Sequence, residues 1–431
     1  MISALHGEIP CRGFLYPKSS DDFLPRHFAK PGCEGEFYEK VAKNWAECMM
    51  YPRFFAQIVG RIWNNLQKDV CRFTMKSQKA LRKKDESKRY LEVRIMELRS
   101  QEVRTLAPEN DPLKMGMGWK VEDLSKPQIL VESTFGDSHP GSAHLDQFVK
   151  EAVQAVNDNG GKAARYFATD MCDGIAQGHD GINYSLPHRD AIVNLVEAQA
   201  NASVYDGGVF IASCDKSVPA MLMSIGRLKD MSAIVVTGGV MEAHTLPKEY
   251  VVNDPACAIN ELLTLEQIGK FDAWEKTGVI PNSQLDYYKH NACPSCGACS
   301  FMGTASTMQI MAEALGLMLP GTALMPATAP ELKQAAYDAG KQLMELVKKG
   351  ITAKDIVTKK SFENAIMVHA AISGSTNATM HLPAVAHEFG IEIDADTFDR
   401  MHRGAHYLLN IRPSGDWPAQ YFYYAGGVPR V

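Results

Sequence analysis

The stretch "GGVFIASCDKSVPA", residues 207–220, decides the fold class. Its first half is an uncharged run of small and apolar residues, which is the pattern of a strand buried on both faces of a sheet. A thiol, a carboxylate and an amine then follow in succession at Cys214, Asp215 and Lys216. These groups are costly to bury without partners, so we expect the strand to end there with the three side chains at its carboxyl end.

Runs of the same kind occur three more times, as "PQILVEST" (127–134), "AARYFAT" (163–169) and "SAIVVTGG" (232–239). Amphipathic segments lie between the runs, at residues 144–160 and 189–203. This alternation predicts an α/β fold with a doubly wound, mostly parallel sheet flanked by helices. Such sheets bind their ligands at the carboxyl ends of the strands.

The first part of the chain has a different character. Residues 76–104 are rich in helix formers of both charge signs, and the stretch "APENDP" at 107–112 interrupts them. We expect a mainly helical N-terminal extension over residues 1–120 and an α/β domain over residues 121–431.

Composition excludes several classes of partner. The net charge of -5 over 431 residues gives no general attraction to nucleic acid or anionic lipid. The N-terminus lacks the basic start and apolar core of a signal peptide. The longest uncharged apolar stretch, residues 314–330, contains three prolines and is not a membrane span. We expect a cytoplasmic protein without nucleic-acid or membrane partners.

The chain has ten cysteines, which in a reducing compartment are free thiols or metal ligands. We interpret Cys11, Cys33, Cys48 and Cys71, which lie outside any motif, as small buried hydrophobic residues.

A second Cys-Asp pair follows another of the predicted strands. In "MCDGIAQGHDG", Cys172 and Asp173 come shortly after residues 163–169, and Gly174 permits a tight turn. Together with Cys214 and Asp215, they place two thiols and two carboxylates at one edge of the sheet. Thiolates suit iron-sulfur clusters and carboxylates suit Mg²⁺, so this edge can hold both kinds of metal side by side.

Three more cysteines stand at every third position in "NACPSCGACSFMGTAS", residues 291–306. Cys299 is the best candidate for a third thiolate, because residues 303–306 can start a helix whose positive end stabilises an anionic cluster. Cys293 and Cys296 compete for this role. Three thiolates leave one iron open, as Lewis-acid catalysis requires. The spacing also resembles a ferredoxin motif, but the fourth, proline-flanked cysteine of that motif is missing. A structural zinc site would need a second pair of ligands at short spacing, and the sequence shows none.

A small polar loop, Ser375, Thr376 and Asn377, precedes an apolar segment in "HAAISGSTNATMHLP", residues 369–383. Its hydroxyls and backbone N–H groups can receive a carboxylate or a phosphate. The plain alternative is that the loop only caps a helix.

In this order along the chain, six stretches resemble one family: "CDGIAQGHDGINYSLPHRDAI", "CDKSVPAMLM", "NACPSCGACSFMGTASTM", "ALGLMLPGTA", "FENAIMVHAAISGSTNATMHLPAVA" and "AGGVPRV". The family is that of the dihydroxy-acid and sugar-acid dehydratases (the ILVD/EDD family, which includes the phosphogluconate, arabinonate and xylonate dehydratases). The resemblance runs from about Lys126 to the last residue.

The resemblance implies β-elimination of water from a 2,3-dihydroxy acid, giving a 2-keto acid. It implies a 2Fe-2S or 4Fe-4S cluster for the leaving hydroxyl and Mg²⁺ for the carboxylate and C2 hydroxyl. Cys214 and Cys299 would be cluster ligands, and Asp173 and Asp215 would be Mg²⁺ ligands. Lys216 would be the catalytic lysine that family members carbamylate to make it a ligand. From the donors of the loop itself, we expect Ser375, Thr376 and Asn377 to bind the substrate. We also expect a homo-oligomer, a dimer or tetramer.

Two departures from the family pattern matter. Gly141 in "HPGSAHL" stands where many members have a cluster cysteine. Phosphogluconate-type members lack that cysteine too and have Cys-Asp-Gly instead, so we assign the third thiolate to Cys172. The family also continues beyond "AGGVPRV" into a β-rich domain with a Mg²⁺-binding glutamate and a serine base, and we expect that domain to be absent here.

The preferred hypothesis is therefore a hydro-lyase acting on a sugar acid or a branched dihydroxy acid. The Cys-Asp-Gly motif and "GMGW" (116–119) favour a sugar acid, whereas "NACPSCGAC" and "HDGINYSLP" are closer to the branched-chain biosynthetic enzyme. The alternative is a non-catalytic iron-sulfur or metal-binding paralog.

Overall fold

The structure, a computed structural model, describes residues 98–255 and 257–431, which belong to one compact unit. The predictions for residues 1–97, including the four scattered cysteines, lie outside the described residues. Helices α3 (Arg99–Leu106) and α4 (Asn110–Gly116) precede the sheet. Ser100 joins α3 to the domain, because its backbone N–H and its hydroxyl both donate to the carboxylate of Asp206.

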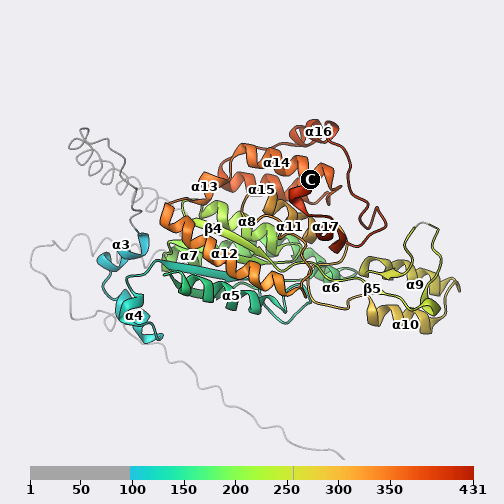
Figure 1. The fold of residues 1–431 in the computed structure, drawn as a ribbon, viewed down its shortest axis with the longest axis horizontal. Coiled ribbons are helices and arrows are strands. Elements are labelled where there is room, and N and C mark those ends of the chain that lie inside the picture. Colours follow the sequence, from blue (N-terminus) through green and yellow to red (C-terminus); the bar gives the residue numbers. More distant parts are fainter. Residues whose placement is uncertain (1–97, 256) are drawn as a thin grey trace, which may run out of the picture. The chain divides into compact units, whose positions relative to one another are not determined.

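The central sheet has the strand order β2-β1-β3-β4, and all of its neighbouring strands are parallel. Helices cover the sheet on both sides (Figure 1). The strands are β1 (Gln128–Ser133), β2 (Lys162–Phe167), β3 (Gly207–Ala212) and β4 (Ser232–Thr237). The predicted parallel α/β sheet is confirmed. Strand β2, expected to be buried, is an edge strand and is partly exposed, whereas β4, the other edge strand, is buried and packs against α12 (Pro330–Lys349).

Alternate residues of the strands pack into two separate cores, as the two-residue period of a strand requires. On one face, side chains such as Val131 and Val209 pack against α5 (Leu145–Asp158) and α12 (Pro330–Lys349). On the other face, Leu130 and Phe210 share a core with α7 (Ser185–Ser203), α8 (Ser217–Arg227), α11 (Thr304–Ala314), α14 (Lys359–Ala371) and α15 (Ala378–Phe389). Helices on both faces make the sheet doubly wound, as predicted.

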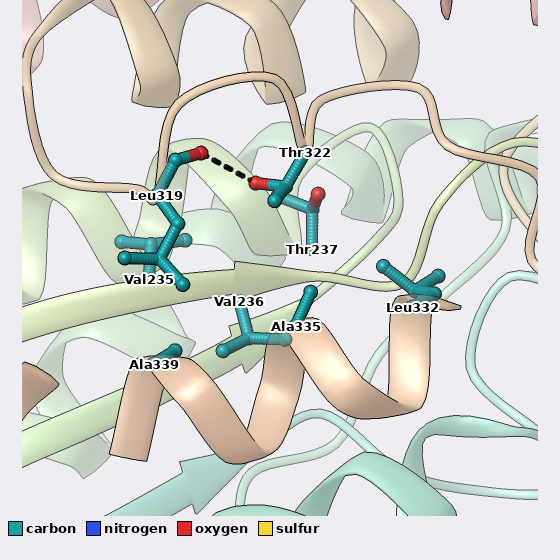
Figure 2. A pocket seen from close by; sticks show the side chains of 8 residues that line it. All are labelled: Val235, Val236, Thr237, Leu319, Thr322, Leu332, Ala335 and Ala339. Atoms are coloured by element: carbon teal, nitrogen blue, oxygen red, sulfur yellow. Dashed lines mark hydrogen bonds between the residues drawn. The ribbon is translucent and has the colours of Figure 1, made fainter. Parts of the chain in front are cut away.

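Helix α12 lies close against β4, as Figure 2 shows. The Thr322 hydroxyl donates to the carbonyl of Leu319 at 2.7 Å in the loop above the strand. The cavity between these elements measures about 10 Å³, room for about one water molecule. It is too small for an organic acid, so this face of the sheet serves packing.

A smaller unit with its own core follows β4. It contains β5 (His244–Thr245), β6 (Leu262–Leu263), α9 (Ile268–Lys276) and α10 (Asn282–Asn291), and it leads directly into the three-cysteine stretch. The other helices are α6 (Asp173–Ala176), α13 (Ala353–Ile356), α16 (Ala395–Arg403) and α17 (Gln420–Tyr424). Single 3-10 turns are Val121–Asp123, Asp180–Tyr184, Lys248–Tyr250, Leu265–Gln267 and Val428–Arg430. Among the described residues, no helix combines the length and the apolar character needed to cross a membrane.

Candidate active site

The two Cys-Asp pairs lie beyond the carboxyl ends of β2 and β3, the strands on either side of β1. Cys172 follows β2 and is the residue that precedes helix α6. Cys214 follows β3, and Lys216 is the residue that precedes helix α8. Because the parallel strands end at the same edge, residues more than forty positions apart in the chain meet there, as predicted.

The two thiols share a hydrogen bond. The Cys214 S–H donates to the sulfur of Cys172, which lowers the pKa of Cys172 to about 6. Backbone N–H groups at the start of α6 stabilise the same thiolate. For Cys214 the same hydrogen bond, together with complete burial, raises the pKa well above its usual value. The pair therefore holds one proton near neutral pH and presents a thiolate, the form that binds metals.

Cys299 and Cys293 of the third loop both feel the thiol pair. The pKa of Cys299 is raised to about 12 by burial and by the negative charges of Cys172 and Asp215. Burial and the charge of Cys172 also raise the pKa of Cys293. The pKa of Cys296 is raised by burial and by the charge of Glu242, and Cys172 is not among the charges that shift it.

The oxygen ligands predicted for Mg²⁺ meet through Lys216. Its Nζ donates to Oδ2 of Asp173 at 2.6 Å and to Oδ2 of Asp215 at 3.3 Å. The lysine side chain is 5% exposed, so the ammonium is held between two carboxylates and out of bulk water. The Ser185 hydroxyl donates to Asp173, and the N–H of Ala305 at the start of α11 donates to Asp215. The lysine occupies the place between two carboxylates where a cation is favoured.

In the described part of the chain, no three His, Cys, Asp or Glu side chains are already grouped as ligands of one ion. Among the predicted oxygen ligands, the Lys216 ammonium lies between the carboxylates of Asp173 and Asp215. The donor types nevertheless fit the expected groups: soft sulfur from Cys172, Cys214 and Cys299 beside hard oxygen from Asp173 and Asp215.

The polar loop meets the start of α11, beside the oxygen set. The Ser375 hydroxyl lies 3.2 Å from that of Thr304, and the Asn377 amide donates to the same Thr304 oxygen at 2.8 Å. The backbone N–H of Ser375 donates to Thr307. Thr376 is exposed, and no contact joins its side chain to the site. Ser375 and Asn377 are therefore brought to the helix N-terminus, whose neighbouring N–H binds Asp215.

A cavity of about 480 Å³ opens on the thiol side of the site, and Cys172, His179, Tyr184 and His188 are among the residues that line it. This volume lies within the range of small-molecule sites.

Two buried side chains that the sequence interpretation did not single out lie beside the thiols. His139 Nε2 lies 3.8 Å from Asp170 Oδ2, and both side chains are 1% exposed. Burial raises the pKa of Asp170 to about 7 and lowers that of His139 to about 4. A Cβ placed on Gly141 would lie 3.1 Å from His139 Nδ1 and 3.2 Å from the sulfur of Cys214. Position 141, where many family members have a cysteine, thus faces the thiol site.

Arg189 and His381 form a second buried pair that was not predicted. Arg189 Nη1 lies 3.1 Å from His381 Nδ1, and His381 is completely buried. Both residues fall inside quoted motifs, "LPHRD" and "TMHLP", where a charged or titratable residue on an apolar helix was the available signal.

Comparison with known proteins identifies the family of the chain. The family model described as "Dihydroxy-acid/6-phosphogluconate dehydratase N-terminal" matches residues 126–431. The chain belongs to this family. The resemblance inferred from its motifs is thereby confirmed, including its start at Lys126.

The curated relatives of the chain are named dihydroxy-acid dehydratases. The chain is 39% identical over 322 residues to "Dihydroxy-acid dehydratase 1" of Methanosarcina acetivorans and 38% identical over 321 residues to "Dihydroxy-acid dehydratase" of Thermodesulfovibrio yellowstonii. A third relative, from Methanothrix thermoacetophila, is 40% identical over 327 residues. The matches cover 74–75% of this chain and 56% of each relative. The chain thus spans about half the length of these relatives.

Proposed function

We propose that the chain forms the cluster- and Mg²⁺-binding part of a hydro-lyase that converts a 2,3-dihydroxy carboxylic acid to a 2-keto acid. The observation that supports it most directly is the juxtaposition of a thiolate pair, Cys172 and Cys214, with Asp173, Lys216 and Asp215 at one edge of the sheet. Membership of the dehydratase family gives the reaction class. The names of the curated relatives favour a dihydroxy acid, and the sugar acids remain a second substrate group for the same chemistry.

The sulfur atoms have one role in this proposal. Cys172, Cys214 and Cys299 hold the iron-sulfur cluster, of the 2Fe-2S or 4Fe-4S type, and leave one iron without a protein ligand. When bound, the cluster and Mg²⁺ supply Lewis acids for the leaving hydroxyl and for the carboxylate end of the acid.

The protein's own side chains bind Mg²⁺ and orient the substrate in this proposal. Asp173 and Asp215 hold Mg²⁺ together with Lys216, which becomes a ligand once it is carbamylated. Ser375 and Asn377, at the N-terminus of α11, orient the substrate carboxylate through their donors, and exposed Thr376 lies beside them. The buried setting of Lys216 keeps bulk water from competing for these oxygens. We also propose a cytoplasmic location, because free thiols need a reducing compartment, and a homo-oligomer.

The experiment starts with the cluster. Protein purified anaerobically is assayed for iron and acid-labile sulfide before and after reconstitution. We expect Cys172→Ser, Cys214→Ser and Cys299→Ser each to lose most of the bound iron. Cys296→Ser is the matched control and should retain it, because Cys172 is not among the charges that shift the pKa of Cys296. Protein that stays free of iron after reconstitution contradicts the proposal.

Turnover is then followed as 2-keto acid formation over a panel of aldonates and branched dihydroxy acids. We expect formation of a keto acid from at least one of them. A stable cluster without turnover of any acid would support the non-catalytic alternative instead.

A further inference from the structure

The Arg189–His381 pair has a fixed hydrogen-bond direction. A guanidinium only donates, so the Nδ1 of His381 accepts from Arg189 at 3.1 Å and has no proton of its own. The imidazole therefore carries its proton on Nε2. Burial and then the charges of Arg189 and Lys216 lower the pKa of His381 to about 3, in agreement with a permanently neutral ring.

The Nε2–H of His381 is a buried donor that lacks an acceptor. His381 is 0% exposed, and no hydrogen-bond partner of Nε2 is present among the described residues. An unpaired buried donor costs about 1–3 kcal/mol, and native structures seldom keep one without a reason.

The position of this donor is set by two helices. Ser185 and Arg189 lie four residues apart and therefore on the same face of α7. Ser185 donates to Asp173, the partner of Lys216, while Arg189 binds His381. Helix α15, which carries His381, also packs against α8, which Lys216 precedes. The charges of Lys216 and Asp173 both act on the His381 ring, so the ring lies within electrostatic range of the Asp173–Lys216 contact.

As an ammonium, Lys216 cannot satisfy this donor, because it has donors only. A carboxylate attached to Nζ would supply the missing acceptor. We propose that His381 is a positioning residue, which Arg189 fixes as an Nε2–H donor and which binds an oxygen of the carbamate formed when CO₂ adds to Nζ of Lys216. This inference rests on the proposed function, and it adds the residues that hold the modified lysine in place.

Formation of the carbamate needs no oxidant or reductant. The lysine nitrogen, after losing a proton, attacks the carbon of CO₂; a nitrogen–carbon bond forms while one C=O electron pair moves to oxygen. A second proton leaves the nitrogen, and both protons pass to solvent, with Asp173 as the nearest relay at 2.6 Å. The result is one carbamate anion between the two aspartates, with one oxygen available to the His381 N–H.

The test measures the carbamate itself. The purified chain is incubated with ¹³C-bicarbonate and Mg²⁺, and ¹³C NMR records the protein-bound carbamate; Lys216→Ala assigns the signal. We expect His381→Leu to reduce the signal about tenfold, as loss of a hydrogen bond to a charged group predicts. His381→Gln should retain most of it, because its amide can accept from Arg189 and still donate. His387→Leu, an exposed histidine of the same helix, is the matched control.

Arg189→Met provides a second variant if His381→Leu does not fold. It frees the ring to exchange its proton between the two nitrogens, so we expect a several-fold smaller signal. A wild-type protein without the signal, or a His381→Leu or Arg189→Met variant with the full signal, overturns the proposal. The readout requires neither iron nor turnover. A failure of the dehydratase proposal is therefore seen separately, as missing iron or missing keto acid.

Discussion

The Nζ of Lys216 lies 2.6 Å from Oδ2 of Asp173, although the two residues are 43 positions apart in the chain. Lys216 follows β3 and Asp173 follows β2, so their contact crosses the edge of the sheet beyond β1. One buried cation thereby holds together the two loops that supply the thiol pair.

Removing this cation should destabilise the domain. In Lys216→Met, Asp173 and Asp215 face each other without a counter-charge. Their side chains are 25% and 22% exposed, so we expect a loss of about 1–3 kcal/mol at pH 7, less than for a fully buried pair. Urea denaturation monitored by circular dichroism measures it. The loss should shrink towards pH 4, because burial raises the pKa of Asp215 and its protonation removes the repulsion.

An exposed ion pair gives the control for this variant. Lys276 contacts Asp272 one helical turn away, and both side chains are well exposed. Lys276→Met should leave the free energy of unfolding almost unchanged, because an exposed ion pair contributes little. Equal losses in the two variants would show that Lys216 contributes no more than a surface charge.

The fold could be predicted largely from the sequence because its signals are local. A buried parallel strand needs only an uncharged apolar run, and all four runs became strands within two residues of their expected ends. The partial exposure of β2 could not be predicted, since strand order depends on packing between distant segments. The residues before 98 lie outside this comparison.

The site could be predicted only where residue types are unusual for their place. The two Cys-Asp pairs and Lys216 stand out at strand ends, and the structure brings them together. His381 and Arg189 did not stand out, because each is one of several polar or charged residues on its helix. Their pairing joins α7 to α15, and no sequence pattern encodes such a contact.

Cys172 should be the most reactive of the described thiols near neutral pH. Its pKa of about 6 depends first on the hydrogen bond from Cys214. In Cys214→Ala that donor is lost, and the pKa of Cys172 should rise towards the usual value of about 8.5. We expect alkylation of Cys172 by iodoacetamide at pH 7 to slow about tenfold, measured by peptide mass spectrometry. Cys296→Ala is the control and should leave the alkylation rate of Cys172 unchanged. The same rate in the wild type, Cys214→Ala and Cys296→Ala would contradict the hydrogen bond between Cys214 and Cys172.

Glu132, buried in β1, should make stability depend on pH. Burial raises its pKa to about 7, against about 4.3 in the unfolded chain. Between these values the folded chain keeps a proton that the unfolded chain has released, so this residue lowers stability as the pH rises to 7. Glu132→Gln removes the effect. At pH 8 we expect the variant to be about 1–3 kcal/mol more stable than the wild type, with a smaller difference at pH 5.

Urea titrations at pH 5, 6, 7 and 8 provide the measurement for Glu132. The matched control is Glu345→Gln, an exposed residue of α12 that pairs with Lys348. Glu345→Gln should leave the free energy of unfolding almost unchanged at each pH, because an exposed ion pair contributes little. A Glu132→Gln difference that is constant across the series would mean that the carboxyl is ionised throughout.

Gly141 should tolerate a side chain poorly, because the thiol site occupies the space next to it. An added methyl group would lie 3.2 Å from the Cys214 sulfur and 3.1 Å from His139 Nδ1, so one of the two must move. We expect Gly141→Ala to lower the thermal midpoint by a few degrees and to reduce the iron retained after anaerobic reconstitution at least twofold. Gly136→Ala, five residues earlier in the same loop, is the control, since a Cβ there meets no atom within 4 Å. If both variants bind iron and melt like the wild type, position 141 does not face the thiol pair.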